Sequence, residues 1–395
     1  MSEEKKKPSP DQLDRWSKVT PSAQPIFQTS VYDYPDLETL DDFYNGIIPN
    51  GYMYSRNGLP NSNELAKQVA KLENTEEGLA CSTGMGALTV ALLSFLGRGS
   101  HVVASNDLYG GTTVLLRDEL PRFGIETTFI NPRDGSSEIK SKFRENTKMV
   151  LIETISNPSI QICDIGMIAD IAHSKNALLV VDNTFASPFV VRPANLGADI
   201  VMHSGTKFLG GHHDVTIGVL CGRSKEMKRM AQFNTRIGTM AGPFDSWLTS
   251  RSVSTWKLRV EKCCENALKL AEYLESRTDK VSKVYYPGLA SNPQHELAMR
   301  IFQKKNLFGG MLSFDLRSGL EQASVFAKSL KSVAIAPSLG GVKTTISHPG
   351  KTSHRYISEE QKKEIGITDA MIRVSVGVED YEEIRQDFGQ ALDRS

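Results

Sequence analysis

Long apolar runs are missing from this 395-residue sequence. No stretch approaches the roughly 18 apolar residues that a membrane-spanning helix needs. The N-terminus also lacks the apolar region of a signal peptide, and the basic cluster Lys5-Lys6-Lys7 fits a polar tail better than a targeting signal. We therefore predict a cytoplasmic protein without a membrane partner.

An excess of either charge is missing as well. Lys and Arg together number 46, as do Asp and Glu, so the formal net charge is zero. Such a balance gives no reason to expect nucleic acid or an anionic membrane as a partner. The five cysteines are an odd number without zinc-like spacing, and Cys263 and Cys264 are adjacent on a predicted helix. The sequence thus predicts a reduced protein with no disulfide framework and no metal centre.

Two apolar segments are present, and each ends in a reactive side chain. Residues 178–181 read as a buried strand followed by Asp182, and residues 200–202 as another that leads to Lys207. Alone, Lys207 would be interpreted as a solvated loop lysine. An acid and a lysine at two strand ends, however, face the crevice where open α/β sheets bind ligands. Pyridoxal phosphate requires this pair, because it attaches to a lysine amine and a carboxylate keeps its ring nitrogen protonated.

Residues 203–212 read His-Ser-Gly-Thr-Lys-Phe-Leu-Gly-Gly-His. This stretch resembles the pyridoxal-lysine motif of the Cys/Met-metabolism enzymes, although that family usually has Ala where Gly205 stands. The family includes cystathionine γ-synthase, cystathionine β- and γ-lyases, methionine γ-lyase and O-acetylhomoserine sulfhydrylase. The resemblance extends from about residue 22 to the C-terminus. It implies an α/β fold of the aspartate-aminotransferase-like type (fold type I).

The domain organisation follows from the same resemblance and from the alternation of strands and helices, which favours a mostly parallel sheet covered on both faces. Residues 1–57 are predicted to form an N-terminal arm that contacts a neighbouring subunit. Residues 58–250 should form the pyridoxal-phosphate-binding domain with this sheet. Residues 251–395 should form a smaller C-terminal α+β domain. The boundary near residue 250 falls inside a long helical stretch.

The resemblance implies a set of cofactor-binding residues. In the family, Tyr54 and Arg56 reach the neighbour's cofactor phosphate, which suits a bidentate guanidinium. Tyr109 stacks on the ring and takes part in proton transfer, beside the catalytic pair Lys207 and Asp182. The other cofactor contacts implied are Ser82, Gly84, Met85, Asn157, Ser204 and Thr206. From the residues alone, Ser82 could be a helix N-cap, Tyr109 a core residue and Asn157 a turn residue.

Substrate-binding residues are implied in the C-terminal half. Arg373 lies on an otherwise apolar strand and would need a partner if buried. By resemblance that partner is the substrate α-carboxylate, with Ser338 helping through its backbone; an internal salt bridge is the alternative.

The distal end of the substrate pocket departs from the cystathionine enzymes. Those enzymes often have a charged residue where this chain has Met53, Val114 or Pro337. A second charged amino-acid head without partners would be costly there, so the pocket resembles that of methionine γ-lyase. Two departures remain. Gly111 stands where methionine γ-lyases have Cys, and Lys343 replaces a usual glutamate.

We therefore predict a pyridoxal-phosphate-dependent carbon–sulfur lyase, active on a small sulfur amino acid, with methionine or homocysteine preferred. A cystathionine β- or γ-lyase of transsulfuration is the alternative, followed by γ-replacement as in cystathionine γ-synthase or O-acetylhomoserine sulfhydrylase. A dinucleotide-dependent oxidoreductase would need a Gly-x-Gly-x-x-Gly turn, which is missing. A binding protein that had lost its chemistry should lack Lys207, Asp182 or Tyr109. Because Tyr54 and Arg56 should act in a neighbour's site, the resemblance implies a homo-oligomer, with a dimer as the catalytic unit and a tetramer as the usual assembly.

Overall fold

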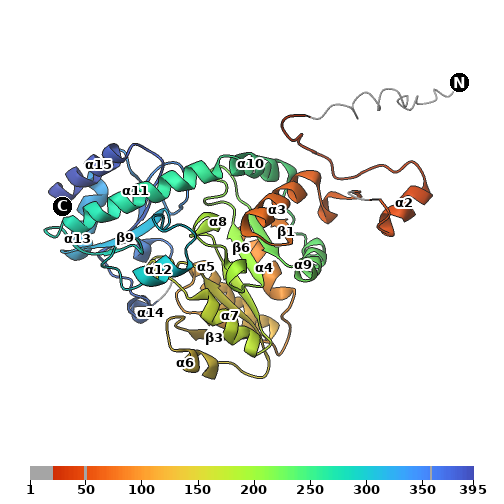
Figure 1. Ribbon diagram of the computed structural model, residues 1–395, viewed down its shortest axis with the longest axis horizontal. Coiled ribbons are helices and arrows are strands. Elements are labelled where there is room, and N and C mark those ends of the chain that lie inside the picture. Colours follow the sequence, from red (N-terminus) through yellow and green to blue (C-terminus); the bar gives the residue numbers. More distant parts are fainter. Residues whose placement is uncertain (1–20, 49–50, 356–357) are drawn as a thin grey trace.

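A computed structural model describes residues 21–48, 51–355 and 358–395. Two sheets organise this part of the chain, one of seven strands and one of five (Figure 1). The arm residues 1–20 and 49–50 lie outside the described residues.

The larger sheet has the strand order β1-β7-β6-β5-β4-β2-β3. Its strands are β1 (Glu77–Cys81), β2 (His101–Ser105), β3 (Glu126–Ile130), β4 (Thr147–Glu153), β5 (Leu178–Asp182), β6 (Ile200–Ser204) and β7 (Gly218–Gly222). The pairs β2·β3, β2·β4, β4·β5 and β5·β6 are parallel, whereas β7 pairs antiparallel with both β6 and β1. The prediction of a mostly parallel sheet is confirmed.

Apolar side chains on both faces explain why these strands are buried. Along β5, Leu179 and Val181 belong to one core cluster, while Val180 belongs to the cluster on the opposite face. Alternate residues of a strand point to opposite faces, so near-continuous apolar runs suit a sheet covered on both sides. Contacts place α4 (Gly84–Leu93) against β6 and β7, and α7 (Ile165–Ser174) against β5.

The smaller sheet has the order β10-β11-β12-β9-β8. Its strands are β8 (Val281–Tyr285), β9 (Met311–Leu316), β10 (Ala334–Ile335), β11 (Thr345–Ser347) and β12 (Met371–Ser375). All of its pairs are antiparallel except β10·β11. It carries Arg373 on β12, opposite Ser313 of β9. The predicted C-terminal α+β unit therefore has a sheet of its own.

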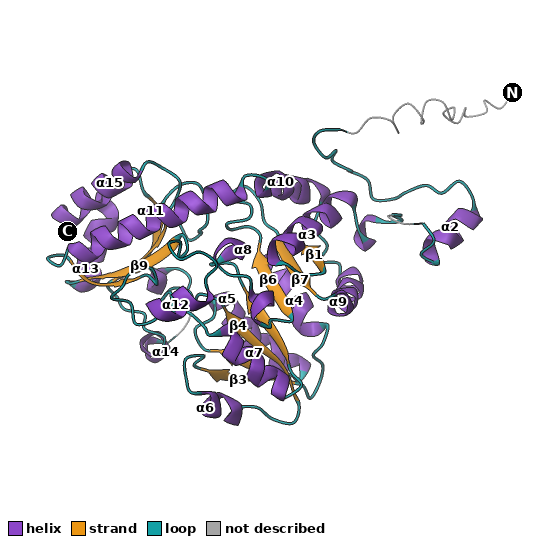
Figure 2. Cartoon of the chain, viewed as in Figure 1, coloured by secondary structure: helices purple, strands orange, loops and turns teal. Residues whose placement is uncertain are grey.

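Helices fill the space around and between the sheets (Figure 2). The long helix α11 (Trp256–Ser276) contacts β8 and β9 of the small sheet and α8 near the large one. The remaining α-helices are α2 (Leu37–Tyr44), α3 (Pro60–Glu73), α5 (Gly110–Val114), α6 (Ser136–Ser141), α8 (Ser187–Val190), α9 (Ser224–Ile237), α10 (Pro243–Val253), α12 (His295–Ile301), α13 (Gly319–Ser329), α14 (Glu359–Glu364) and α15 (Tyr381–Arg394). Within the described residues, no helix combines the length and apolar character needed to cross a membrane.

Some expectations about individual elements need correction. The strand expected over residues 200–202 extends to Ser204. The sequence analysis missed β1 and β7, because β7 is bounded by glycines and β1 contains one, and glycine weakens a strand signal. The domain boundary near residue 250 stays a prediction; that position lies within α10.

Candidate active site

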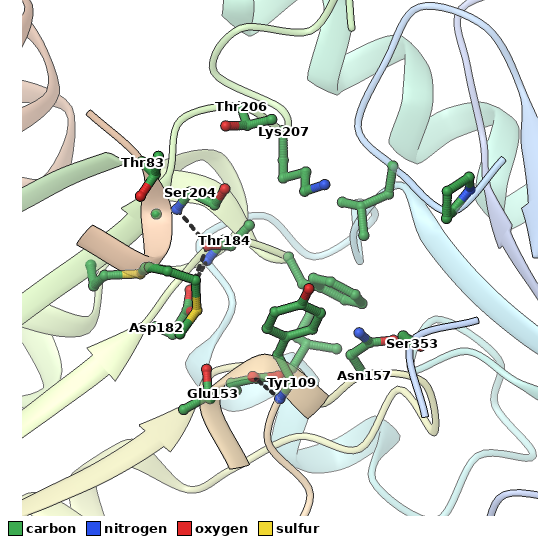
Figure 3. Close-up of a pocket in the computed structure, with 18 of the residues that line it drawn as sticks. Thr83, Tyr109, Glu153, Asn157, Asp182, Thr184, Ser204, Thr206, Lys207 and Ser353 are labelled. Carbon is green, nitrogen blue, oxygen red and sulfur yellow. Dashed lines mark hydrogen bonds between the residues drawn. The ribbon is translucent and has the colours of Figure 1, made fainter. Parts of the chain in front are cut away.

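A cavity of about 240 Å³ opens where β4, β5 and β6 end, between the two sheets (Figure 3). Of the site residues predicted from the sequence, nine line it: Gly84, Met85, Tyr109, Asn157, Asp182, Ser204, Thr206, Lys207 and Arg373. The position agrees with the rule that open α/β sheets bind ligands beyond the carboxyl ends of their strands.

Lys207 follows β6 in a tight turn, in which its backbone N–H donates to the carbonyl of Ser204 at 3.1 Å. Its Nζ donates to Oγ of Ser338 at 3.0 Å. Burial, and secondarily the positive charge of Arg373, lowers the pKa of the Lys207 amine below its ordinary value. An amine with a lowered pKa can exist in the neutral form and accept a proton.

Asp182 ends β5 and faces the same cavity as Lys207. Thr184 donates two hydrogen bonds to its Oδ1, from the backbone N at 2.9 Å and from Oγ1 at 2.5 Å. The Thr184 hydroxyl oxygen in turn accepts from the backbone N–H of Ser204 at 2.8 Å. Burial raises the pKa of Asp182, and the Thr184 hydrogen bonds oppose that rise. No role for Thr184 is expected from the sequence, but its position shows that it orients the acid.

Glu153 is a second carboxyl group in the cavity, and the sequence analysis gave it no role. It ends β4 directly opposite Asp182 in the strand register. Its Oε1 accepts a hydrogen bond from the backbone N–H of Tyr109 at 2.6 Å. Burial, followed by the negative charge of Asp182, holds the pKa of Glu153 well above its ordinary value. Backbone hydrogen bonds from Tyr109 and Asn157 only partly oppose that rise. For Asp182 the Thr184 bonds oppose burial directly, so the proton of the pair belongs on Glu153 and the negative charge on Asp182.

The start of α4 forms another wall of the cavity. Thr83 caps this helix, since its Oγ1 accepts from the backbone N–H of Gly86 at 2.8 Å. The first N–H groups of a helix have no intrahelical acceptor, and the helix dipole favours an anion there. Gly84 allows the close approach of Ser204, because an added Cβ would lie 2.9 Å from the Ser204 Cβ. These groups, with the hydroxyls of Ser204 and Thr206, can hold a phosphate.

Arg373 is 3% exposed and forms the far wall. Its Nη1 donates to Oδ1 of Asn157 at 2.9 Å, and its Nη2 donates to the carbonyl of Ser338 at 3.3 Å. Its Nε has no hydrogen-bond partner, and no carboxylate among the described residues forms an ion pair with it. The internal salt bridge considered from the sequence is therefore not formed. A buried guanidinium with a free donor can bind a carboxylate.

Several predicted site residues lie elsewhere. Ser338 touches Lys207 but does not line the cavity, and Ser82 uses its backbone N–H to bind the carbonyl of Thr239 at 2.8 Å. Arg56 donates to the carbonyl of Thr235 at 3.2 Å. Both residues line a different cavity of the same chain. Tyr54, Met53 and Val114 also lie outside the active-site cavity of this chain.

The sequence analysis missed several residues of the cavity wall. They are mostly small polar or apolar side chains from turns and loops, which carry no motif of their own: Thr83, Thr112, Ile155, Thr184, Phe185, Met202, Thr216, Leu339 and Ser353. Figure 3 shows Ser353 opposite the strand ends, on a loop of the C-terminal half. Only a folded chain brings this loop to the cavity.

The residues present fit pyridoxal phosphate. The cavity combines an amine with a lowered pKa, a carboxylate at a neighbouring strand end, a tyrosine ring and a helix start that can receive a phosphate. A metal is not suggested: within residues 21–48, 51–355 and 358–395, no group of three or more His, Cys, Asp or Glu side chains is arranged to hold one.

Comparison with known proteins gives matches over nearly the whole chain. The sequence pattern of the family described as Cys/Met metabolism PLP-dependent enzyme matches residues 11–393. A cystathionine γ-lyase of Bacillus subtilis is 42% identical over 93% of each chain. An L-methionine γ-lyase of Fusobacterium nucleatum is 39% identical over 94% of this chain and 93% of the relative.

A solved structure agrees with these matches. It is described as a putative O-acetylhomoserine (thiol)-lyase from Campylobacter jejuni and contains a pyridoxyl-lysine phosphate. The TM-score is 0.89 at 30% identity, covering 94% of this chain and 95% of that one. Relatives named for elimination and for thiol transfer thus share one fold with this chain.

Proposed function

The chain belongs to the Cys/Met metabolism family of pyridoxal-phosphate-dependent enzymes, and we propose that it is a carbon–sulfur lyase for methionine or homocysteine. The products would be a thiol, ammonia and a 2-oxo acid. The observation that supports this proposal is that the cavity wall, within the part of the chain that the structure describes, has no charged side chain left over for a second charged group of the substrate. The charged residues of the wall are assigned to the cofactor, to the α-carboxylate and to proton transfer.

Three charged groups of the cavity act on the cofactor or the substrate in this proposal. When bound, pyridoxal phosphate supplies an electron sink for negative charge at the substrate Cα. Asp182 would hold the proton of the ring nitrogen, and the N-terminus of α4 would bind the phosphate. Arg373 orients the substrate by its α-carboxylate. Lys207, with its lowered pKa, removes the α-proton and returns protons to later positions.

Among residues 21–48, 51–355 and 358–395, four charged side chains line the cavity and no others do. Apart from Lys207, Arg373, Asp182 and Glu153, the wall consists of uncharged residues, including the apolar Ile155, Phe185, Pro337 and Leu339. A second ammonium or carboxylate group, such as cystathionine carries, would be desolvated there without a partner in this chain. An S-methyl group would meet a suitable surface. This wall is the observation that favours methionine or homocysteine.

A cystathionine lyase is the second candidate, and Gly111 favours it. An added Cβ at Gly111 would lie 2.6 Å from Cε1 of Tyr109. The present ring position of Tyr109 therefore leaves no room for the cysteine that the sequence resemblance associates with methionine γ-lyases at this position. The cystathionine γ-lyase of Bacillus subtilis is also one of the most similar relatives.

A product assay separates these candidates. The purified holoenzyme would receive L-methionine, L-homocysteine, L-cysteine and L-cystathionine separately, with 2-oxo acid and thiol as readouts. We expect turnover of methionine or homocysteine to be at least about tenfold faster than that of cystathionine. The reason is that the second charged head of cystathionine would lose its hydration in the cavity without gaining a partner. Turnover confined to cystathionine would contradict the proposal. Absence of elimination with the cofactor bound would instead point to γ-replacement on an acyl-homoserine.

A further inference from the structure

Directly behind the cavity lies a buried polar cluster with no role in the chemistry above. It consists of Glu73 at the end of α3, Thr154 after β4, Asn183 after β5 and His203 within β6. All four are at most 1% exposed. Buried polar groups in such a position are costly unless they are hydrogen-bonded.

Glu73 is the centre of this cluster. Its Oε1 accepts from Nε2 of His203 at 2.6 Å and from Nδ2 of Asn183 at 2.7 Å. Asn183 extends the network, since its Oδ1 accepts from the Thr154 hydroxyl at 2.9 Å. One side chain of α3 is thus connected to the ends of three neighbouring strands.

Each bonded residue is a sequence neighbour of a residue that faces the cavity. Thr154 follows Glu153, Asn183 follows Asp182, and His203 precedes Ser204. Successive residues of a strand point to opposite faces, so the cluster lies on the face away from the cavity. On the cavity side, Thr184 connects β5 and β6, because it donates to Asp182 and accepts from the backbone N–H of Ser204.

We propose that Glu73 is a positioning residue for the cofactor site: it clamps the ends of β4, β5 and β6 from behind. The hydrogen bonds of Glu73 then fix the position of Asp182 relative to the turn that carries Lys207. Asp182 and Lys207 make none of these bonds. Sites held by a second layer of hydrogen bonds lose affinity when that layer is removed, even though the binding residues remain. The proposal concerns cofactor binding and is independent of which sulfur amino acid is the substrate.

The same strands provide matched controls at their opposite ends. Asp199, which precedes β6, also holds a histidine, with Oδ2 bonded to Nε2 of His173 at 3.0 Å. Thr147, which begins β4, accepts at Oγ1 from the backbone N–H of Arg144 and shares a hydrogen bond with Nδ1 of His101, both at 2.8 Å. Both controls are largely buried and lie away from the cavity.

The test measures the dissociation constant of pyridoxal phosphate from the apoprotein, together with the thermal midpoint of the apoprotein. Glu73→Leu should raise the dissociation constant by about tenfold or more, as loss of outer partners does at metal sites. Asp199→Leu should lower the thermal midpoint comparably while leaving that constant within about twofold. Glu73→Gln, whose amide oxygen still accepts both hydrogen bonds, should restore most of the affinity.

A milder pair covers the case in which Glu73→Leu does not fold. Thr154→Val removes one hydroxyl of the cluster and should raise the dissociation constant by about threefold, compared with no change for Thr147→Val. Equal dissociation constants for the two valine variants would overturn the proposal. So would a Glu73→Leu protein that loses thermal stability but binds the cofactor as the wild type does.

Discussion

At the residue scale, the site depends on two neighbouring carboxyl groups having different protonation states. Glu153 and Asp182 lie opposite each other on adjacent strands, and two close carboxylates in a buried site cannot both ionise cheaply. Thr184 donates from its hydroxyl and its backbone to Asp182. Backbone groups of Tyr109 and Asn157 hydrogen-bond to Glu153, but burial and the negative charge of Asp182 still hold its pKa well above the ordinary value. Glu153 in this state fixes the segment that bears Tyr109, and Asp182 is left as the charged group that we propose for the ring nitrogen.

Glu153→Gln should therefore change how the stability of the apoprotein depends on pH. The pKa of Glu153 is raised on folding, so the folded chain keeps a proton that the unfolded chain loses above the ordinary carboxyl pKa. The free energy of unfolding then falls as pH rises through that window, by at most about 1.4 kcal/mol per pH unit. Glutamine keeps the acceptor for Tyr109 but cannot titrate. Urea unfolding at about pH 6 and about pH 8 should show the variant gaining stability relative to wild type.

A stability difference between the two proteins that does not change with pH would mean that Glu153 titrates as an ordinary carboxyl group.

The sequence could indicate Lys207 and Asp182, because each follows an apolar strand and belongs to a long motif. It could not indicate the role of Glu153. That role depends on the register between β4 and β5 and on the distance to Tyr109, which are set only by the folded sheet.

At the element scale, the start of α4 is the part of the proposed cofactor site that secondary structure provides directly. Thr83 caps the helix with a hydroxyl, and Gly84 permits the close approach of Ser204. The sequence analysis expected this helix and its glycine. It missed the antiparallel strands β1 and β7, although their pairing holds the residues before α4 against the end of β6. A weak local strand signal was overridden there by tertiary pairing.

Thr83→Ala should lower the free energy of unfolding of the apoprotein by about 1 kcal/mol, because the Gly86 N–H loses its capping acceptor. Thr83→Ser keeps the hydroxyl and should stay within about 0.3 kcal/mol of wild type. Urea unfolding of both variants gives the comparison. If serine were as destabilising as alanine, the contribution of Thr83 would come from packing of its methyl group and not from capping.

At the scale of the whole molecule, the described part of the N-terminal arm exposes apolar side chains that need a partner surface. Helix α2 has no buried residue and lies apart from both sheets in Figure 1. Large apolar side chains are exposed along the described arm, among them Val31 at 55%, Leu37 at 75% and Ile47 at 64%. Several large exposed apolar side chains on one segment are typical of an interaction site. We propose a second copy of this chain as the partner, which agrees with the position of Arg56 outside its own active-site cavity.

A mixing experiment tests whether the two copies share their active sites. Arg56→Ala and Lys207→Ala should each be nearly inactive, the first through loss of a phosphate contact and the second through loss of the catalytic amine. In a hybrid dimer, the intact Lys207 of one chain would meet the intact Arg56 of the other, so one of the two sites is complete. Random reassociation into isologous dimers makes half of the molecules hybrids, so about one quarter of wild-type activity should return. A hybrid verified by differential tags that regains no activity would show that Arg56 serves its own chain, and the exposed arm would then need a different partner.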